Sequence, residues 1–68
     1  CKYDIMIELK YLKVKEYRRN RKLLGIKREE AINQLKSYED DERIDKNTLR
    51  KYVVIFVGHD LKLLEEII

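Results

Sequence analysis

The first pattern in the chain is an alternation of apolar and polar side chains over residues 2–10. Ile5, Ile7 and Leu9 fall on one side of an extended chain, because side chains alternate with a period of two. The polar side carries Asp4, Met6, Glu8 and Lys10. The pattern predicts a β-strand with one apolar face and one face turned to solvent.

The strongest strand signal is the run Tyr-Val-Val-Ile-Phe-Val-Gly at residues 52–58. Continuous β-branched and aromatic residues predict a strand that is covered on both faces. Gly58, His59 and Asp60 predict a turn after it. Residues 61–68 fit either a short helix or a return strand, and we favour a strand that forms a hairpin with residues 52–57.

A helix is predicted between these strands, beginning at Lys27. The Glu pair at 29–30 suits a helix N-terminus, where negative charge is favoured. Apolar side chains recur at helical spacing and predict a buried stripe, formed by Ala31, Ile32, Leu35 and Tyr38. Gln34 lies near one edge of this stripe.

The segments around the helix carry no clear apolar period. Residues 11–24 are strongly polar, and we expect a poorly ordered loop with some helical character over 17–24, broken at Gly25. The helix is expected to fade over 39–43. Residues 45–48 predict a turn or a short second helical start.

The order strand, helix, buried strand, strand predicts an α/β fold with a mixed sheet. A strand–helix–strand unit implies a parallel pair joined by a right-handed crossover. The helix can cover only one sheet face, and a chain of 68 residues buries little surface. We therefore expect residues 1–68 to form a single partial domain, whose open face is covered by further chain or by a second copy.

Charge is spread unevenly along the chain, although the net charge is only +3. Lys and Arg crowd residues 10–28, and acidic residues cluster over 39–45. The basic segment can attract a phosphate backbone, and the alternative is a solvated surface without a partner. A single Cys excludes an internal disulfide and fits a cytoplasmic location. No membrane-spanning or secretory pattern is present.

Glu8 and Lys10 are the candidate chemical pair, because they share one strand face. A carboxylate can bind a divalent metal, and a neighbouring ammonium can orient water or stabilise negative charge. Glu-x-Lys alone is unspecific, since many exposed strands carry both residue types. His59 beside Asp60 suits a general acid or a ligand, but no second His or Cys accompanies it, which favours a simple turn residue.

Three segments are more informative in combination than singly: Ile-Glu-Leu-Lys-Tyr at 7–11, Glu-Ala-Ile-Asn-Gln-Leu-Lys-Ser-Tyr at 30–38, and Val-Val-Ile-Phe-Val-Gly at 53–58. In this order they resemble the C-terminal part of the PD-(D/E)xK nuclease superfamily. More narrowly, they are similar to the nuclease-like domain of AAA-ATPase-like proteins. The resemblance covers nearly the whole chain and implies a restriction-endonuclease-like fragment.

The resemblance also implies site residues. Glu8 would be a metal ligand, assisted by the carbonyl of Leu9, and Lys10 would activate or position the attacking water. Gln34 and Tyr38 match the Gln-x-x-x-Tyr motif of helicase–nuclease members and share one helix face. The alternatives are a solvent-facing amide for Gln34 and a core aromatic for Tyr38.

One ligand of the superfamily is missing, because its Asp lies on a strand before Glu-x-Lys. Asp4 is about 13 Å from Glu8 along an extended strand, too far to share an ion directly. We expect a Mg²⁺ or Mn²⁺ site only in the complete domain. That domain would act on DNA and lie beside the ATPase domain of the parent protein, and we expect this piece to be inactive alone. The competing hypotheses are a non-catalytic nucleic-acid-binding module and a structural or oligomerisation module.

Overall fold

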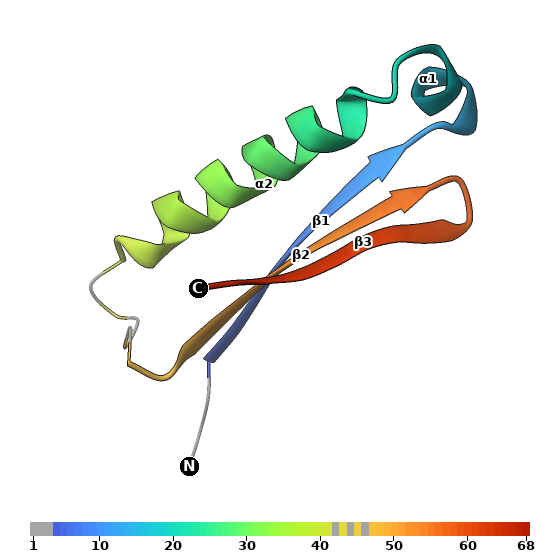
Figure 1. The fold of residues 1–68 in the computed structure, drawn as a ribbon. Coiled ribbons are helices and arrows are strands. Elements are labelled where there is room, and N and C mark those ends of the chain that lie inside the picture. Colours follow the sequence, from blue (N-terminus) through green and yellow to red (C-terminus); the bar gives the residue numbers. More distant parts are fainter. Residues whose placement is uncertain (1–3, 42, 44, 46) are drawn as a thin grey trace.

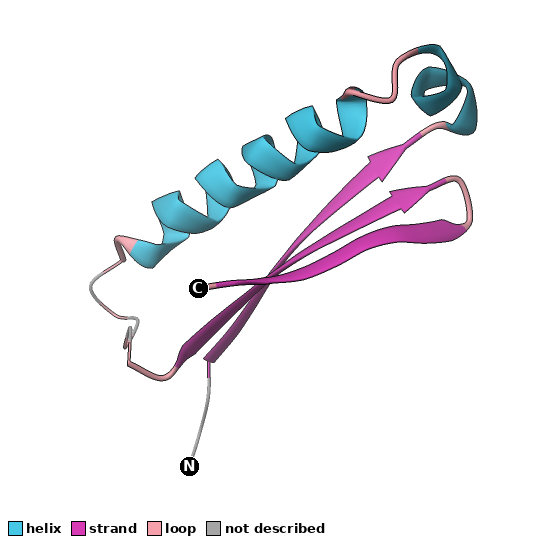
Figure 2. Cartoon of the chain, in the orientation of Figure 1, coloured by secondary structure: helices cyan, strands magenta, loops and turns pink. Residues whose placement is uncertain are grey.

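The computed structural model describes residues 4–41, 43, 45 and 47–68, and arranges them as a three-stranded sheet and a long helix (Figure 1). In chain order the elements are β1 (Asp4–Leu12), α1 (Val14–Arg19), α2 (Leu23–Glu39), β2 (Leu49–Val57) and β3 (Asp60–Ile67). β1 pairs parallel with β2, and β2 pairs antiparallel with β3. The predicted α/β arrangement with a mixed sheet is confirmed, and α2 lies along the sheet (Figure 2).

The core lies between α2 and the middle of the sheet. Its most deeply buried cluster consists of Ala31 and Leu35 of α2 with Val53 and Ile55 of β2. Ala31 and Leu35 are four residues apart, so they lie on one face of the helix. The predicted stripe is confirmed at these two positions and at Ile32, which packs against them. Tyr38 is 51% exposed and does not belong to the core.

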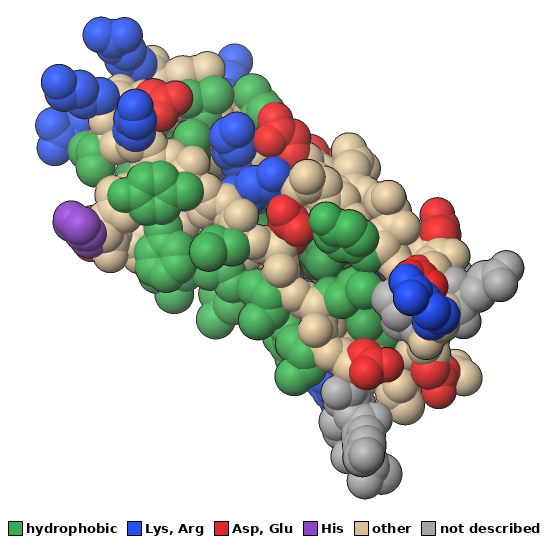
Figure 3. Space-filling view, turned by 180° about the vertical axis from the view of Figure 1, so that it is seen from behind, with side chains coloured by type: hydrophobic (Ala, Val, Ile, Leu, Met, Phe, Trp, Pro, Cys, Tyr) green, Lys and Arg blue, Asp and Glu red, His purple; other side chains and the backbone are tan. Residues whose placement is uncertain are grey.

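The sheet face opposite α2 is left open by the described residues. The largest contribution comes from β1, whose Ile5, Ile7, Leu9 and Tyr11 are 59–61% exposed. Tyr52, Val54 and Phe56 of β2 lie on the same face and are only partly buried. Within the described residues α2 covers one face of β2, as expected for this piece of chain, and the predicted second cover is not supplied. Figure 3 shows hydrophobic side chains in a band along the molecule.

β1 is turned the opposite way from the prediction, because its charged side faces α2. The side chains of Glu8 and Lys10 are only 18% and 19% exposed. In the parallel register, Glu8 lies beside Val53 and Lys10 beside Ile55. Neighbouring residues on paired strands share a sheet face, and these two β2 side chains point into the core.

The segment predicted to be a loop is largely helical. β1 continues to Leu12, α1 follows, and α2 begins four residues before the predicted Lys27. Gly25 lies inside α2, and nothing lies within 4 Å of the position that its Cβ would occupy. Leu24, about two turns before Ala31, packs against the core on the same helix face. This burial outweighs the low helix propensity of glycine.

The predicted turn and the return strand after β2 are both confirmed. Gly58 has φ +61°, a left-handed conformation that glycine adopts without a Cβ penalty. Its N–H donates to the Leu12 carbonyl over 2.9 Å. A Cβ at this position would lie 2.6 Å from Cγ2 of Val14. The turn thus accommodates the first residue of α1 closely.

The connection after α2 begins where it was predicted, since α2 ends at Glu39; residues 42, 44 and 46 lie outside the described residues. Asp45 organises the predicted turn. Its carboxylate accepts from the Asn47 N–H over 2.9 Å, and its carbonyl accepts from the Thr48 N–H over 3.3 Å. The alternative of a second helical start is not adopted by the described residues.

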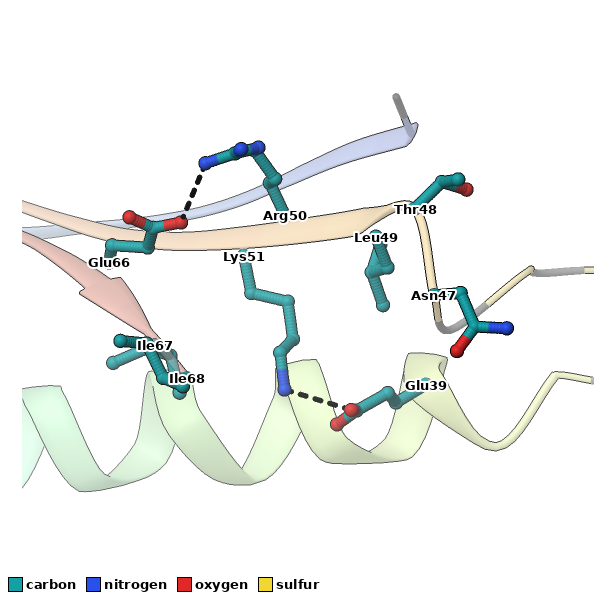
Figure 4. Close-up of a pocket in the computed structure, with 9 residues that line it drawn as sticks. All are labelled: Glu39, Asn47, Thr48, Leu49, Arg50, Lys51, Glu66, Ile67 and Ile68. Atoms are coloured by element: carbon teal, nitrogen blue, oxygen red, sulfur yellow. Dashed lines mark hydrogen bonds and ion pairs between the residues drawn. The ribbon is translucent and has the colours of Figure 1, made fainter. Parts of the chain in front are cut away.

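Ion pairs tie one flank of α2 to β2 and β3. Arg28 donates to both carboxylate oxygens of Glu65, over 2.8 and 2.6 Å. These hydrogen bonds lower the pKa of Glu65 and raise that of Arg28. Lys51 donates to Glu39 over 2.8 Å beside a hollow of about 340 Å³ (Figure 4). Among the described residues, no helix has the length and apolar character needed to cross a membrane.

Candidate active site

Glu8 and Lys10 meet on the α2 side of β1. Their spacing of two puts both side chains on one face, and Nζ of Lys10 lies 3.8 Å from Oε1 of Glu8. At this distance the two groups attract each other without forming a short hydrogen bond. Both charged ends therefore remain able to engage a third group between them.

The polarity of β1 is reversed relative to what stability alone favours. Its helix side carries Met6, Glu8, Lys10 and Leu12, so a charged pair interrupts an otherwise apolar row. Placing charges under a helix costs desolvation, while the apolar residues of the same strand face outward. A local violation of this kind is typical of functional positions. The reversal therefore singles out Glu8 and Lys10.

The carbonyl of Leu9 points to the free edge of the sheet. The Asp4 N–H donates to the Thr48 carbonyl, and the Leu12 carbonyl accepts from the Gly58 N–H. Even-numbered residues of β1 thus direct their backbone groups toward the β2 side. Backbone groups alternate along a parallel strand, so the groups of Leu9 are directed to the opposite edge. This edge is unpaired within the described structure.

Gln34 and Tyr38 lie on the flank of α2 nearer to β1. Arg28 and Glu39 reach β3 and β2 from the other flank, and each residue turns the helix by about 100°. Both Gln34 and Tyr38 are exposed.

The donor atoms of this site suit a hard divalent cation only in part. The carboxylate of Glu8 and the carbonyl of Leu9 are oxygen ligands of the kind that Mg²⁺ prefers, with water completing the shell. Asp4 is exposed at the start of β1. Within the part of the chain that the structure describes, no group of three or more His, Cys, Asp or Glu residues assembles a metal site. A second anionic ligand would have to come from elsewhere.

Two further regions bear on function. His59 is an exposed turn residue, as the simpler interpretation predicts. Sequence reasoning missed a second feature, a hollow between α1 and β3 that includes Tyr17, Arg21 and Lys62. Its sequence signals are the basic run that includes Arg21 and the spacing of four between Tyr17 and Arg21, whose guanidinium carbon lies 5.8 Å from the centre of the tyrosine ring.

Comparison with known proteins gives one match. The family model described as the PD-(D/E)XK nuclease superfamily matches residues 1–66 of the 68 in the chain. No curated protein and no solved structure matches.

Proposed function

Because the chain belongs to the PD-(D/E)XK nuclease superfamily, we propose that it forms part of a divalent-metal-dependent nuclease that hydrolyses DNA phosphodiesters. Glu8 and Lys10 are its catalytic pair. The observation that carries this proposal is the reversed polarity of β1, which brings both charged side chains together under α2.

Hydrolysis adds water across a phosphorus–oxygen bond. Glu8 and the Leu9 carbonyl would hold a Mg²⁺ or Mn²⁺ ion, which when bound makes its water more acidic and polarises a phosphoryl oxygen. Lys10 donates hydrogen bonds to the attacking water or to a non-bridging oxygen, and its charge stabilises the negative charge that develops there. Gln34, on the flank of α2 nearer to β1, would contact a neighbouring phosphate, and Tyr38 lies one turn further along α2.

The described residues supply one carboxylate to this site, so we propose that a second acidic ligand arrives on a strand paired with the free edge of β1. The superfamily resemblance assigns an Asp to such a strand. The complete domain would then be the active form, linked to an ATPase domain, and this chain alone would bind metal weakly and cleave little.

Metal binding tests the ligand assignment directly. Titration of Mn²⁺ into the chain, followed by calorimetry, should show weak binding that Glu8→Gln removes. Asp4→Asn is the matched control, because it deletes an exposed acid from the same strand. Lys10→Met should retain binding. Equal losses in Glu8→Gln and Asp4→Asn would remove Glu8 from its proposed role.

Cleavage tests the chemistry. In the complete domain, plasmid DNA should be cut with Mg²⁺ or Mn²⁺ and protected by a chelator, and Glu8→Gln or Lys10→Met should each abolish cutting. Circular dichroism checks that the variants remain folded. Chelator-sensitive cleavage that survives both substitutions places the chemistry elsewhere.

A non-catalytic nucleic-acid-binding module is the second candidate function. The exposed basic residues of α1 favour it, because they suit phosphate binding without any chemistry at Glu8. Absence of cleavage with every metal, combined with salt-sensitive DNA binding, would decide for this function. Absence of both would leave a structural or oligomerisation module, for which the open apolar sheet face is the supporting observation.

A further inference from the structure

A second hollow, of about 200 Å³, lies between α1 and the hairpin of β2 and β3. It is lined by Val14, Tyr17, Arg18, Arg21, Val57, Asp60 and Lys62. Two elements that are distant in the chain therefore bring three cations to one concave surface, against one carboxylate. We call Arg18, Arg21 and Lys62 the hollow cations.

The hollow cations have no acidic partner among the described residues, and the same holds for the neighbouring cations Lys13, Lys15, Arg19 and Lys22. Several cations elsewhere in the fold have an acidic partner, as in the pairs of Arg28 with Glu65 and of Lys51 with Glu39. Figure 3 shows Lys and Arg side chains gathered at one end of the molecule. Positive charge is thus concentrated and uncompensated at α1.

The position of Arg21 suits direct hydrogen bonding to a phosphate group, rather than only a general attraction of anions. Its guanidinium lies over the ring of Tyr17, which is itself partly buried and therefore limits the positions of Arg21. A guanidinium held in place loses less freedom when it binds, and its planar fork matches two phosphate oxygens. Lys62 faces the same hollow from β3 as a point charge.

The hollow lies beyond the carboxyl end of β1, on the path that continues from Lys10. Val14 follows Lys10 by four residues, about 13 Å of extended chain. A nucleic-acid strand carries one charge per about 3.4 Å of helix axis, so this distance spans at most about four phosphates. A strand that places one phosphodiester at Glu8 and Lys10 can thus place another at the hollow.

We propose that the hollow cations bind the phosphate backbone of DNA, a few nucleotides away from the bond held at Glu8 and Lys10. The location of the bound strand relative to Glu8 rests on the proposed nuclease function, whereas the binding itself requires only the cations. The hollow cations come from the α1 region and from β3, which suits a DNA backbone that lies across the hollow. An anionic membrane is the competing partner, and the test below includes it.

The test measures DNA affinity in chelator, where no cleavage occurs. A fluorescein-labelled 20-base-pair duplex of about two helical turns reports binding to the chain by anisotropy, at several salt concentrations. The double variant Arg18→Ala/Arg21→Ala should bind at least ten-fold more weakly at low salt. Its slope of log affinity against log salt should fall by about 1.8, since each phosphate contact contributes about 0.9.

The control is Lys36→Ala/Arg43→Ala, which removes the same charge from exposed positions near the other end of α2. It should change the affinity less than two-fold and leave the slope unchanged. Lys62→Ala tests the same site without changing α1. It should lower the slope of log affinity against log salt by about 0.9. Equal effects of the control and the α1 variant, or no DNA binding by the wild type, overturn the proposal.

Two further measurements separate this proposal from the others. In the complete domain, Glu8→Gln should lose cleavage with metal while it retains DNA binding, and this combination isolates the catalytic pair. Normal DNA binding by Arg18→Ala/Arg21→Ala, with Glu8-dependent cleavage, overturns the hollow site and leaves the nuclease function standing. Sedimentation with phosphatidylserine vesicles that depends on the hollow cations, in the absence of DNA binding, assigns the surface to a membrane.

Discussion

Replacing Gly58 by alanine should destabilise the fold by about 2–5 kcal/mol. The left-handed φ of +61° costs an alanine roughly 1–2 kcal/mol. The new Cβ would lie 2.6 Å from Cγ2 of Val14, where ordinary contact begins at 3.4 Å. Relief of that overlap requires a shift of α1 or of the hairpin, and overpacking of this kind typically costs about 1–3 kcal/mol.

The two contributions can be separated with Val14→Ala. Val14 is 41% exposed, so its truncation should cost less than about 1 kcal/mol on its own. In the double variant Gly58→Ala/Val14→Ala the steric part should disappear and the backbone part should remain. The double-mutant cycle should therefore give a favourable coupling of about 1–3 kcal/mol, equal to the steric part.

Urea unfolding followed by circular dichroism measures all four proteins, provided that the denaturant slope stays constant. For a domain of this size the single variant Gly58→Ala should melt at least about 8 °C below the wild type. A loss below about 1 kcal/mol would show that the backbone relaxes out of the left-handed region. Coupling near zero would show that α1 does not pack against the turn.

Two further predictions concern the stability of α2 and its attachment to the sheet. Gly25→Ala should stabilise the chain by about 0.5–1 kcal/mol, because the position is helical and has open space for a Cβ; an unchanged or lower melting temperature contradicts this. The guanidinium of Arg28 lowers the pKa of Glu65, so the pair stabilises the fold above the ordinary carboxyl pKa, about 4.3, and this stabilisation is lost as pH falls through the lowered folded value. Glu65→Gln should therefore lose less unfolding free energy than the wild type below about pH 4.3, and parallel pH curves for the two proteins would refute the reasoning.

The sequence predicts the centre of this fold better than its margins. A β-branched run specifies β2, and the spacing of Ala31 and Leu35 specifies the packed face of α2, because both signals follow from burial. Residues 13–22 have no such signal. α1 is positioned by its contact with Gly58, more than forty residues away in the chain.

The candidate site likewise has features that the sequence predicts and features that it does not. The spacing of Glu8 and Lys10 correctly places them side by side. Alternation states which residues share a face, but not which face is packed, and here the apolar side of β1 is the open one. The sequence shows Arg18 and Arg21 within a basic segment, but it does not show that Lys62 joins them, because that proximity depends on the hairpin.

The reversed polarity of β1 has a consequence for the folding landscape. A slip of β1 by one residue against β2 would turn Ile5, Ile7 and Leu9 toward α2 and release the charged pair to water. Hydrophobic burial therefore favours the shifted register over the native one. Such a conflict between a local preference and the native fold is called local frustration. The native register is held instead at the strand ends, where Leu12 is buried and its carbonyl accepts from Gly58. The register of the strand that carries the candidate chemistry thus depends on contacts that are remote from Glu8.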